Sequence, residues 1–178
     1  MAIIRGLFEE NTPGIVNAQA EERSVEHVQR DIYDSHRHRV FSLAFHMTGN
    51  EIKAEKLLTD TFVSAFQADP KPDSAMIDSA LIAGLRSLFH LNPGLHAPVL
   101  ASSEMIGRNV RRTDMEEAIQ ELPAFERLAF LLRDVEGYSA EAIAQLLKVP
   151  QAEINRTLFS ARIRLRCILA EITAERAA

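Results

Sequence analysis

The sequence has little of what cross-links, metal sites and membrane spans are built from. Its one cysteine, Cys167, excludes an internal disulfide framework and a cysteine-based zinc site. No apolar run approaches the roughly 18 residues that cross a bilayer. The apolar stretch within residues 1–8 is too short for a signal peptide. We therefore expect a cytoplasmic protein with no segment inserted directly into a membrane.

Tryptophan is absent, and only 6% of the residues are aromatic. Seven glycines and seven prolines among 178 residues are too few for a turn-rich all-β protein. Leu, Ala, Ile, Glu and Arg are plentiful instead, and this composition favours helices. No strand-like alternation competes with the helical spacing of the apolar residues. The sequence predicts an all-α protein with room for one compact domain or two small ones.

Breaks in the helical spacing divide the chain. The Asn-Thr-Pro-Gly run at 11–14 argues against a helix there, and the two prolines at 70 and 72 predict a loop. Apolar residues at helical spacing predict helices near 24–47, 51–67 and 74–91. The predicted segments are a loose N-terminal extension (1–23), a three-helix domain (24–91), a linker (92–112) and a second small helical domain (113–174).

Four further helices are expected in the second domain. Thr113 followed by Glu116 fits a capping box, so the first of them should begin there. Pro123 ends that helix, and Gly137 is a natural end for the next one. Ser139 then caps a short helix that ends near residue 147. A long helix from about 151 to 172 carries an apolar stripe, formed by Ile154, Leu158, Ala161, Leu165, Ile168 and Ile172.

The charge is distributed unevenly along the chain. A net charge of −5 argues against a general nucleic-acid binder, which is usually basic. Residues 148–167, however, contain five basic residues and one acidic residue. The acidic average therefore hides one basic helix near the C-terminus.

That basic helix is the second part of a helix-turn-helix pattern, made of residues 139–147, a turn at 148–150 and the helix from 151. Such a motif places short polar side chains at a helix N-terminus against base edges, while basic residues contact phosphates. The spacing alone is compatible with a helix that contacts DNA and with a helix whose basic face contacts only water. Phe159 lies off the apolar stripe, where it could contact a thymine methyl group or pack on the neighbouring domain. The polar residues off the stripe are Gln151, Glu153, Asn155, Arg156 and Ser160, followed by Arg162.

Residues 121–166 resemble region 4 of the extracytoplasmic-function (ECF) sigma factors, the small two-domain members of the bacterial sigma superfamily. The motifs that match in order are Leu122-Pro123, Leu131-Leu132-Arg133, Glu136-Gly137-Tyr138-Ser139, Ala142-Ile143-Ala144 and Ser160-Ala161-Arg162. Residues 33–66 are similar to region 2 of the same family. The matching positions there are Tyr33, His36, Val40, Leu43-Ala44, Thr48-Gly49, Ala54-Glu55, Leu57, Thr61-Phe62 and Ala65.

The resemblance implies transcription initiation by a sequence-specific factor that recruits core RNA polymerase to promoter DNA. In the family, region 2 binds the β′ clamp helices, region 4 contacts the β flap, and anti-sigma factors are partners. The third helix of region 2 and its flanks melt and read the downstream promoter element. The resemblance places DNA contacts at Asn155, Arg156, Phe159 and Ser160. With Gln151, Glu153 and Arg162 from the polar side of the same helix, these are the predicted DNA-binding residues. The resemblance places polymerase-binding residues at Glu55, Leu58, Asp60 and Phe62.

The sequence departs from the family pattern at several positions. Lys56 stands where the family has an acid, which reverses one charge at the expected polymerase surface. The third helix carries one arginine, Arg86, and no tryptophan, so it is poorly equipped for strand melting. Asn155 stands where a basic residue is usual, and Lys148 where glycine is frequent. An alternative is therefore a sigma-like interaction protein, which binds an anti-sigma factor or polymerase without melting DNA. A simple helix-turn-helix regulator would leave the region 2 resemblance unexplained.

Other chemistry finds little support in the sequence. No glycine-rich phosphate loop, catalytic triad order or paired-carboxylate signature stands out, so we expect no enzyme, no cofactor and no small-molecule substrate. His36 and His38 are two residues apart, which places them on different sides of a helix and argues against a metal pair. Phe62, Phe66 and Phe89 are at core spacing. Cys167 beside the apolar stripe is interpreted as a small hydrophobic residue rather than a redox sensor.

Overall fold

The structure, a computed structural model, describes residues 13–93 and 110–177, and every regular element in these ranges is helical. The prediction of an all-α fold is confirmed. The elements are α1 (Pro13–Thr48), α2 (Glu51–Ala68), α3 (Ser74–Leu88), α4 (Arg112–Glu121), α5 (Ala124–Phe130), η1 (Leu131–Val135), α6 (Ala140–Leu147) and α7 (Gln151–Ala177). The π-helical turn η1 continues directly from α5.

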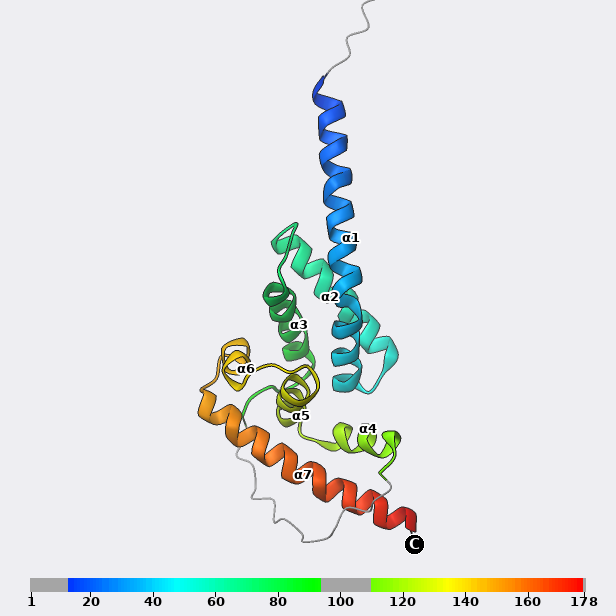
Figure 1. Ribbon diagram of the computed structural model, residues 1–178, viewed down its shortest axis with the longest axis vertical. Helices are drawn as coiled ribbons and strands as arrows, with labels where there is room; N and C mark the ends of the chain where they lie inside the picture. Colours follow the sequence, from blue (N-terminus) through cyan, green and yellow to red (C-terminus); the bar gives the residue numbers. More distant parts are fainter. Residues whose placement is uncertain (1–12, 94–109, 178) are drawn as a thin grey trace, which may run out of the picture.

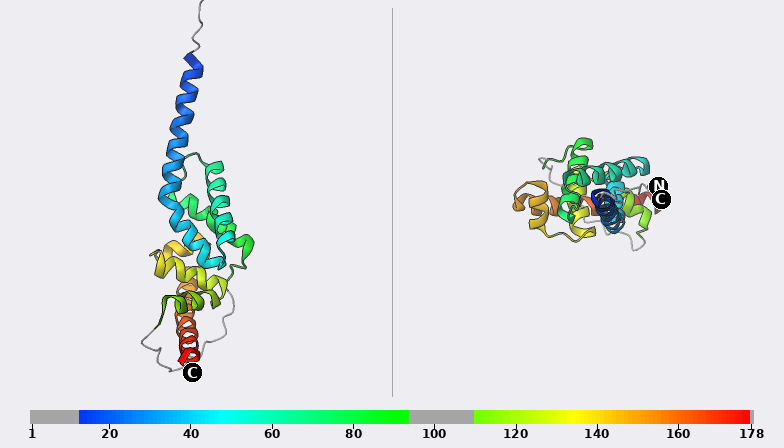
Figure 2. Two further views of the ribbon diagram at one scale, coloured as in Figure 1. Left: turned by 90° about the vertical axis from the view of Figure 1, so that its right-hand side faces the viewer. Right: turned by 90° about the horizontal axis from the view of Figure 1, so that it is seen from above.

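The first helix is longer than the sequence indicates. We expected a loose extension through residue 23, but α1 begins at Pro13 and runs without interruption to Thr48. Proline is well suited to the first turn of a helix, because its missing N–H would have no intrahelical partner there. Residues 1–12 lie outside the described part of the chain. The N-terminal turns of α1 project away from the other helices (Figures 1 and 2).

Local side chains explain where α2 and α3 begin. Gly49 takes a positive φ of 62° after α1, which glycine adopts without strain. The Asn50 side chain then accepts a hydrogen bond of 2.9 Å from the Lys53 N–H and caps α2. Asp73 caps α3 in the same way, accepting from the Met76 N–H at 2.8 Å. The predicted loop at 68–73 lies between these two helices.

The start of α4 differs from the predicted capping box at Thr113 and Glu116. The helix begins at Arg112, and the Asp114 carboxylate accepts the Arg111 N–H at 2.8 Å. Glu116 instead accepts a hydrogen bond of 2.8 Å from the Arg112 side chain one turn away. A carboxylate three residues after the N-cap residue can accept the N–H of that residue, and Asp114 occupies this position relative to Arg111.

The buried apolar side chains of both halves form one continuous cluster. In the N-terminal half, α2 packs on α1 and α3, while in the C-terminal half α7 packs on α4, α5 and α6. The halves meet where α1 contacts α4 and α5, and where α3 contacts α6. Figure 1 shows α5 and α6 beneath the lower ends of α1 and α3, with α7 crossing below them. Among the described helices, none is both long and apolar enough to cross a membrane.

Candidate nucleic-acid interface

The helix-turn-helix predicted from the sequence is present. Helix α6 begins after Ser139, whose hydroxyl accepts a hydrogen bond of 3.0 Å from the Ala142 N–H. It ends at Lys148, the only non-glycine residue with positive φ (57°) in the described chain. The N–H groups of Lys148 and Val149 donate to the carbonyls of Gln145 and Ala144, which closes the helix in a Schellman-type end. The turn therefore has the geometry that glycine favours, but carries a lysine.

Helix α7 packs on the rest of this half through its predicted stripe. The buried members are Ile154, Leu158, Ala161, Leu165 and Ile168, and Ile172 is partly buried against the same cluster. Thr157 is also fully buried. Since the stripe faces inward, the remaining faces of α7 are left to solvent or partners. The half-buried Cys167 lies next to the stripe.

Five of the seven predicted DNA-binding side chains are exposed, and four of these lie on the N-terminal part of α7. Gln151, Asn155, Arg156 and Phe159 are all exposed, and Phe159 retains 68% of its accessible surface. The Arg156 guanidinium lies 2.7 Å from the Glu153 carboxylate one turn earlier. A large apolar side chain beside an arginine and an amide makes this surface suited to base edges that mix methyl groups and acceptors.

Of the other three predicted residues, Glu153 pairs with Arg156, while Ser160 and Arg162 lie against acidic side chains of the same half. Arg162 donates to both oxygens of Asp134 at 2.7 and 3.1 Å, and this hydrogen bonding raises the pKa of the guanidinium. The Ser160 hydroxyl donates to Glu126 at 2.9 Å, and Arg164 donates to the second oxygen of Glu126 at 3.1 Å. The basic C-terminal part of the helix is thus partly neutralised by residues that precede it by 28 to 38 positions.

Glu126 is a residue that the sequence did not single out. Its side chain is fully buried in α5, at 0% exposure. A buried carboxylate needs charged or hydrogen-bonding partners to remain in the interior, and Ser160 and Arg164 supply them. In the sequence Glu126 stands between Phe125 and Arg127, and this local context does not reveal partners more than 30 residues away.

The predicted polymerase-binding residues divide into surface and core. Glu55 and Asp60 are exposed on α2, and Leu58 is half-buried. Phe62 lies in the core at 4% exposure, with its ring 4.8 Å from that of Tyr33. The Lys56 ammonium lies 2.8 Å from the Asp60 carboxylate. The charge that departs from the family pattern therefore pairs with one of the predicted binding residues.

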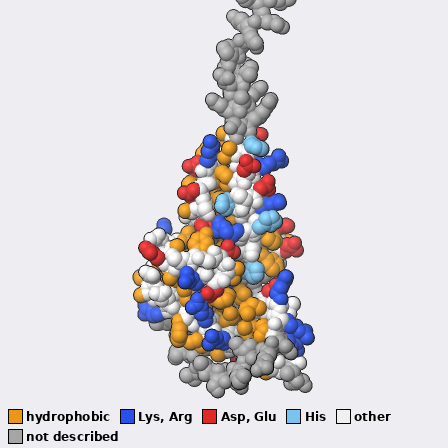
Figure 3. All heavy atoms as spheres, viewed as in Figure 1, with side chains coloured by type: hydrophobic (Ala, Val, Ile, Leu, Met, Phe, Trp, Pro, Cys, Tyr) orange, Lys and Arg blue, Asp and Glu red, His pale blue; other side chains and the backbone are white. Residues whose placement is uncertain are grey.

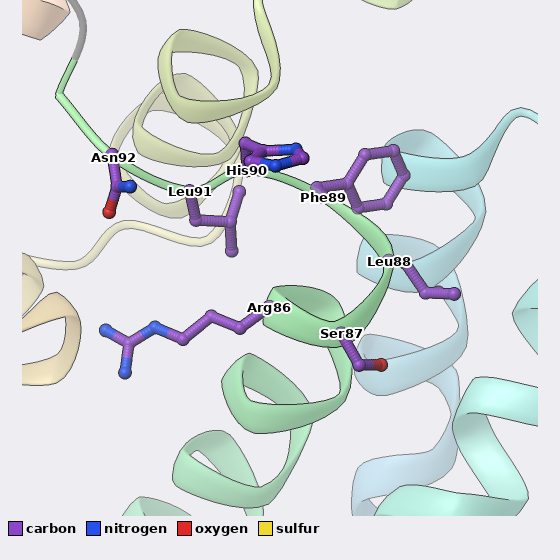
Figure 4. A pocket seen from close by; sticks show the side chains of 7 residues that line it. All are labelled: Arg86, Ser87, Leu88, Phe89, His90, Leu91 and Asn92. Carbon is purple, nitrogen blue, oxygen red and sulfur yellow. The ribbon is translucent and has the colours of Figure 1, made fainter.

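The third helix uses its one arginine within the chain. Arg86 donates a hydrogen bond of 2.7 Å to the carbonyl of Leu147, the last residue of α6. A hollow of about 360 Å³ lies at this end of α3 and is lined by residues 86–92. Figure 4 shows the Arg86 side chain extending away from Ser87, Leu88 and Phe89. Arg86 therefore already has a partner within the chain, although it is the residue of α3 best suited to a phosphate.

A polar cluster of three side chains joins the two halves beside this contact. The Arg39 guanidinium of α1 lies 2.6 Å from the carboxylate of Asp78 on α3, which is 6% exposed. Tyr138, in the turn before α6, donates its hydroxyl hydrogen bond to Asp78 and accepts one of 2.8 Å from Arg39. Burial, the hydrogen bond to Asp78 and the charge of that carboxylate raise the pKa of Tyr138 to about 12. The sequence did not reveal this cluster.

The C-terminal end of α1 is also bound by the other half. Arg127 of α5 donates to the carbonyl of Met47 at 2.8 Å, and Gln120 of α4 donates to the carbonyl of His46 at 2.6 Å. The last carbonyls of a helix lack intrahelical partners, so these side chains satisfy groups that would otherwise need water. Gly49 lies close to the Gln120 side chain, and a Cβ at this position would come within 2.9 Å of its amide oxygen.

Charge and metal-ligating groups outside these contacts are dispersed. Along α1, acidic and basic side chains alternate on the face seen in Figure 3, and basic side chains are more frequent over the lower helices. Within residues 13–93 and 110–177, no three His, Cys, Asp or Glu side chains gather as a metal site would require. The arrangement suits binding to a polyanion through α7.

Comparison with known proteins agrees with this arrangement. Residues 112–165 match the family model described as Sigma-70, region 4. The chain is 27% identical over 163 residues to the ECF RNA polymerase sigma factor SigE of Mycolicibacterium smegmatis, an alignment that covers 83% of this chain. It spans 63% of the length of that relative.

A solved structure has the same fold. It is that of the sigma factor RpoE in complex with the anti-sigma factor NepR from Bartonella quintana, with a TM-score of 0.56 and 19% identity. The match covers 85% of this chain and 97% of the solved chain. The region 4 match is confined to the helix-turn-helix half, and the alignment with the relative runs through both halves, so the chain is similar to the ECF sigma factors, which are transcription regulators.

Proposed function

We propose that this chain binds core RNA polymerase in the cytoplasm and directs promoter-specific transcription initiation. The observation that carries the proposal is the exposed N-terminal face of α7, which presents Gln151, Asn155, Arg156 and Phe159 within the region 4 match. We assign residues 24–91 to a polymerase-binding unit and residues 113–174 to a DNA-binding unit. Residues 92–112 link them, and residues 1–23 precede the polymerase-binding unit.

The side chains of α7 divide the recognition of DNA between them. Gln151, Asn155 and Phe159 contact base edges, and Arg156 is positioned by Glu153 at 2.7 Å. Arg162 is fixed by Asp134 through two N–H groups, so its remaining N–H groups are directed to a phosphate. Ser160 supports the helix through Glu126. The promoter sequence follows from these contacts.

The polymerase-binding surface lies on α2. Glu55, Leu58 and Asp60 contact the β′ clamp helices, while Phe62 holds α2 on the core from beneath. Ile52 is 77% exposed on the same helix and adds an apolar contact. Lys56 competes with the polymerase for Asp60, because it already forms an ion pair of 2.8 Å with it. The helix-turn-helix half contacts the β flap.

A second candidate function is favoured by one observation on α3. Its only arginine is hydrogen-bonded to Leu147. The helix then has no second basic side chain to contact the phosphates of a melted strand. On that basis the chain would bind an anti-sigma factor or polymerase without opening promoter DNA. An anti-sigma factor is a partner in either case, supported by the RpoE structure, which was solved with one.

Run-off transcription separates the two functions. The purified full-length chain is added to bacterial core RNA polymerase with genomic fragments from its own source. Promoter-specific transcripts that depend on the chain are the expected result. Tight association with core polymerase and no transcript on any fragment would favour the second function. The matched control is a chain with Arg156→Ala, which should reduce the transcripts without reducing core binding.

A further inference from the structure

We propose that Glu126 fixes the direction of the Ser160 hydroxyl, so that Ser160 contacts a promoter base as a hydrogen-bond acceptor only. Glu126 is then a positioning residue for sequence recognition as well as a buried part of the core. The proposal deepens the proposed function and rests on it, because it requires that the exposed face of α7 meets promoter DNA. It adds Ser160 to the side chains that contact bases and names the class of base selected, which is adenine or cytosine on the strand that Ser160 faces.

Ser160 lies at the edge of the exposed face of α7. It is half-buried, one turn after the exposed Arg156 and directly after the exposed Phe159. Residues one turn apart are neighbours on a helix surface, so the Ser160 oxygen is within reach of a partner that contacts Arg156. On its other side α7 packs on α5, which carries Glu126 (Figure 1). The Ser160 hydroxyl therefore lies between a buried acid and the outer face of the helix.

The contact with Glu126 determines where the hydroxyl hydrogen points. A serine hydroxyl has one hydrogen to donate and two lone pairs that accept, and it rotates to suit its partner. Ser160 lies 2.9 Å from Oε1 of Glu126, and Arg164 donates to Oε2 of the same carboxylate at 3.1 Å. Carboxylate oxygens only accept, so the single hydrogen of Ser160 is directed inward. A hydrogen bond to a charged group is stronger than a neutral one, which opposes rotation of the hydroxyl.

A hydroxyl that can only accept distinguishes bases by their amino groups. In the major groove adenine presents its N6 amino group and cytosine its N4 amino group, whereas guanine O6 and thymine O4 are acceptors. A serine with a free hydrogen pairs with either kind of group. Ser160 would instead oppose one acceptor to another at guanine or thymine, and both would stay unpaired. We expect a preference of about tenfold for adenine or cytosine at this one position.

Glu126→Gln should release the hydroxyl hydrogen while keeping the size of the side chain. Because Arg164 can only donate, the amide oxygen of the glutamine turns toward it. The amide NH2 group then faces Ser160 and donates to its oxygen. The Ser160 hydrogen is left to donate outward, so guanine and thymine become acceptable. The preference for adenine or cytosine should therefore disappear or reverse.

Two further variants separate this role from simple support of the helix. Ser160→Ala removes the hydroxyl, so the preference should disappear at one position and remain at the others. Arg164→Lys is the matched control, because it keeps a cationic donor for Oε2 of Glu126 and leaves Ser160 unchanged. It should keep the base preference even where the stability falls. A purely structural role of Glu126 would lower the affinity for all sequences alike.

The experiment is a selection from a randomised library of duplex DNA at low salt. The purified full-length chain is used alone and bound to core RNA polymerase, as wild type and as each of the three variants. Sequencing of the bound DNA gives the base preference at every position. The sequence selected by the wild type is then titrated by fluorescence anisotropy with each of the four bases at the position that Ser160→Ala affects. Circular dichroism verifies that each variant keeps its helix content.

The expected result is a preference for adenine or cytosine at one position in wild type and Arg164→Lys. Ser160→Ala should show no preference there, and Glu126→Gln should accept guanine or thymine. An unchanged preference in either Ser160→Ala or a folded Glu126→Gln would overturn the proposal. If Glu126→Gln does not fold, the base that depends on Ser160 decides, since guanine or thymine in wild type would contradict an acceptor-only hydroxyl.

Failure of the proposed function gives a different result. Absence of run-off transcripts contradicts promoter-specific initiation and leaves the selected bases to decide the role of Glu126. Absence of any enriched sequence, both with the chain alone and with core polymerase, would overturn the role of Glu126 whatever the run-off transcription shows.

Discussion

The two halves of the molecule use arginine in opposite ways. In the C-terminal half, Arg156 is exposed on the first turns of α7 and pairs with Glu153 one turn earlier. In the N-terminal half, Arg39 and Arg86 are directed toward groups at the junction, Asp78, Tyr138 and Leu147. An arginine side chain is thus available to an external partner in the C-terminal half, whereas the N-terminal arginines bind groups at the junction of the two halves. Resemblance to a family motif predicts the first role and does not predict the second.

The largest effect is expected where a carboxylate is fully buried within one half. Glu126→Ala leaves Arg164 and Ser160 without their acceptor, which should lower the free energy of unfolding by about 3 kcal/mol. Urea denaturation followed by circular dichroism measures it. Glu117→Ala, at an exposed position on α4, should change the stability by less than about 0.5 kcal/mol.

Asp78→Ala in the N-terminal half should lower the free energy of unfolding less than Glu126→Ala does. Asp78 bridges the halves, and Arg39 keeps its hydrogen bond to the Tyr138 hydroxyl when the carboxylate is removed. We therefore expect a smaller loss, about 2 kcal/mol. A loss equal to that of Glu126→Ala would show that the junction stabilises the fold as strongly as the interior of the C-terminal half does, and the contrast between the halves would fail.

The exposed arginine of α7 should affect binding and not stability. Under the proposed function, Arg156→Ala should weaken binding to the upstream promoter element by about 2 kcal/mol and reduce the salt slope by about one. Anisotropy titrations at several salt concentrations measure both. Arg112→Ala on α4 is the matched control, since this arginine is also exposed and also paired along its own helix. Equal effects of the two substitutions would contradict the assignment of α7 as the recognition helix.

The N-terminal cap of α6 should contribute moderately to the free energy of unfolding. Ser139→Ala removes the acceptor of the Ala142 N–H at the helix N-terminus, which should cost about 1 kcal/mol. Thermal unfolding measures it, and Ser139→Asp should restore most of the loss because aspartate is also a good N-cap. No recovery with aspartate would show that the hydroxyl has a role other than capping.

The smallest expected effect is a gain in stability from a substitution at Lys148. Lys148 has a φ of 57°, a conformation that glycine adopts with less strain than lysine. Lys148→Gly should therefore raise the free energy of unfolding by about 0.5 kcal/mol. Lys148→Ala, which keeps a Cβ, should give no comparable gain. A decrease with glycine would indicate that the lysine side chain stabilises the turn directly.

Local patterns predicted much of the fold. The stripe from Ile154 to Ile168, the cap at Ser139 and the left-handed Gly137 were all identified, and the structure contains each of them. Such features depend on residues three or four positions apart, so their spacing is visible in one sequence. The predicted start of the first helix at residue 24 was wrong, because a proline that breaks a helix interior is favourable at the first turn, and α1 begins at Pro13.

The candidate site was predictable only in part. The exposed positions of α7 followed from the side of the helix opposite its stripe, but the partners of Ser160 and Arg162 did not, since Glu126 and Asp134 lie 34 and 28 residues away. The sequence supported two incompatible predictions for Phe62. Its spacing predicted a core residue, and the family resemblance predicted a contact with polymerase. Its burial agrees with the first, and only packing against Tyr33 could show this.

The sequence by itself determined the helices, their polar and apolar faces, and the family resemblance, because all of these are set by residues close together in the chain. Only the tertiary structure decided which charged groups are available to a partner. Asp78 and Tyr138 are 60 residues apart, and Arg39 and Tyr138 are 99 apart. Contacts at such separations arise from the packing of helices on each other, which leaves no periodic signal in the sequence.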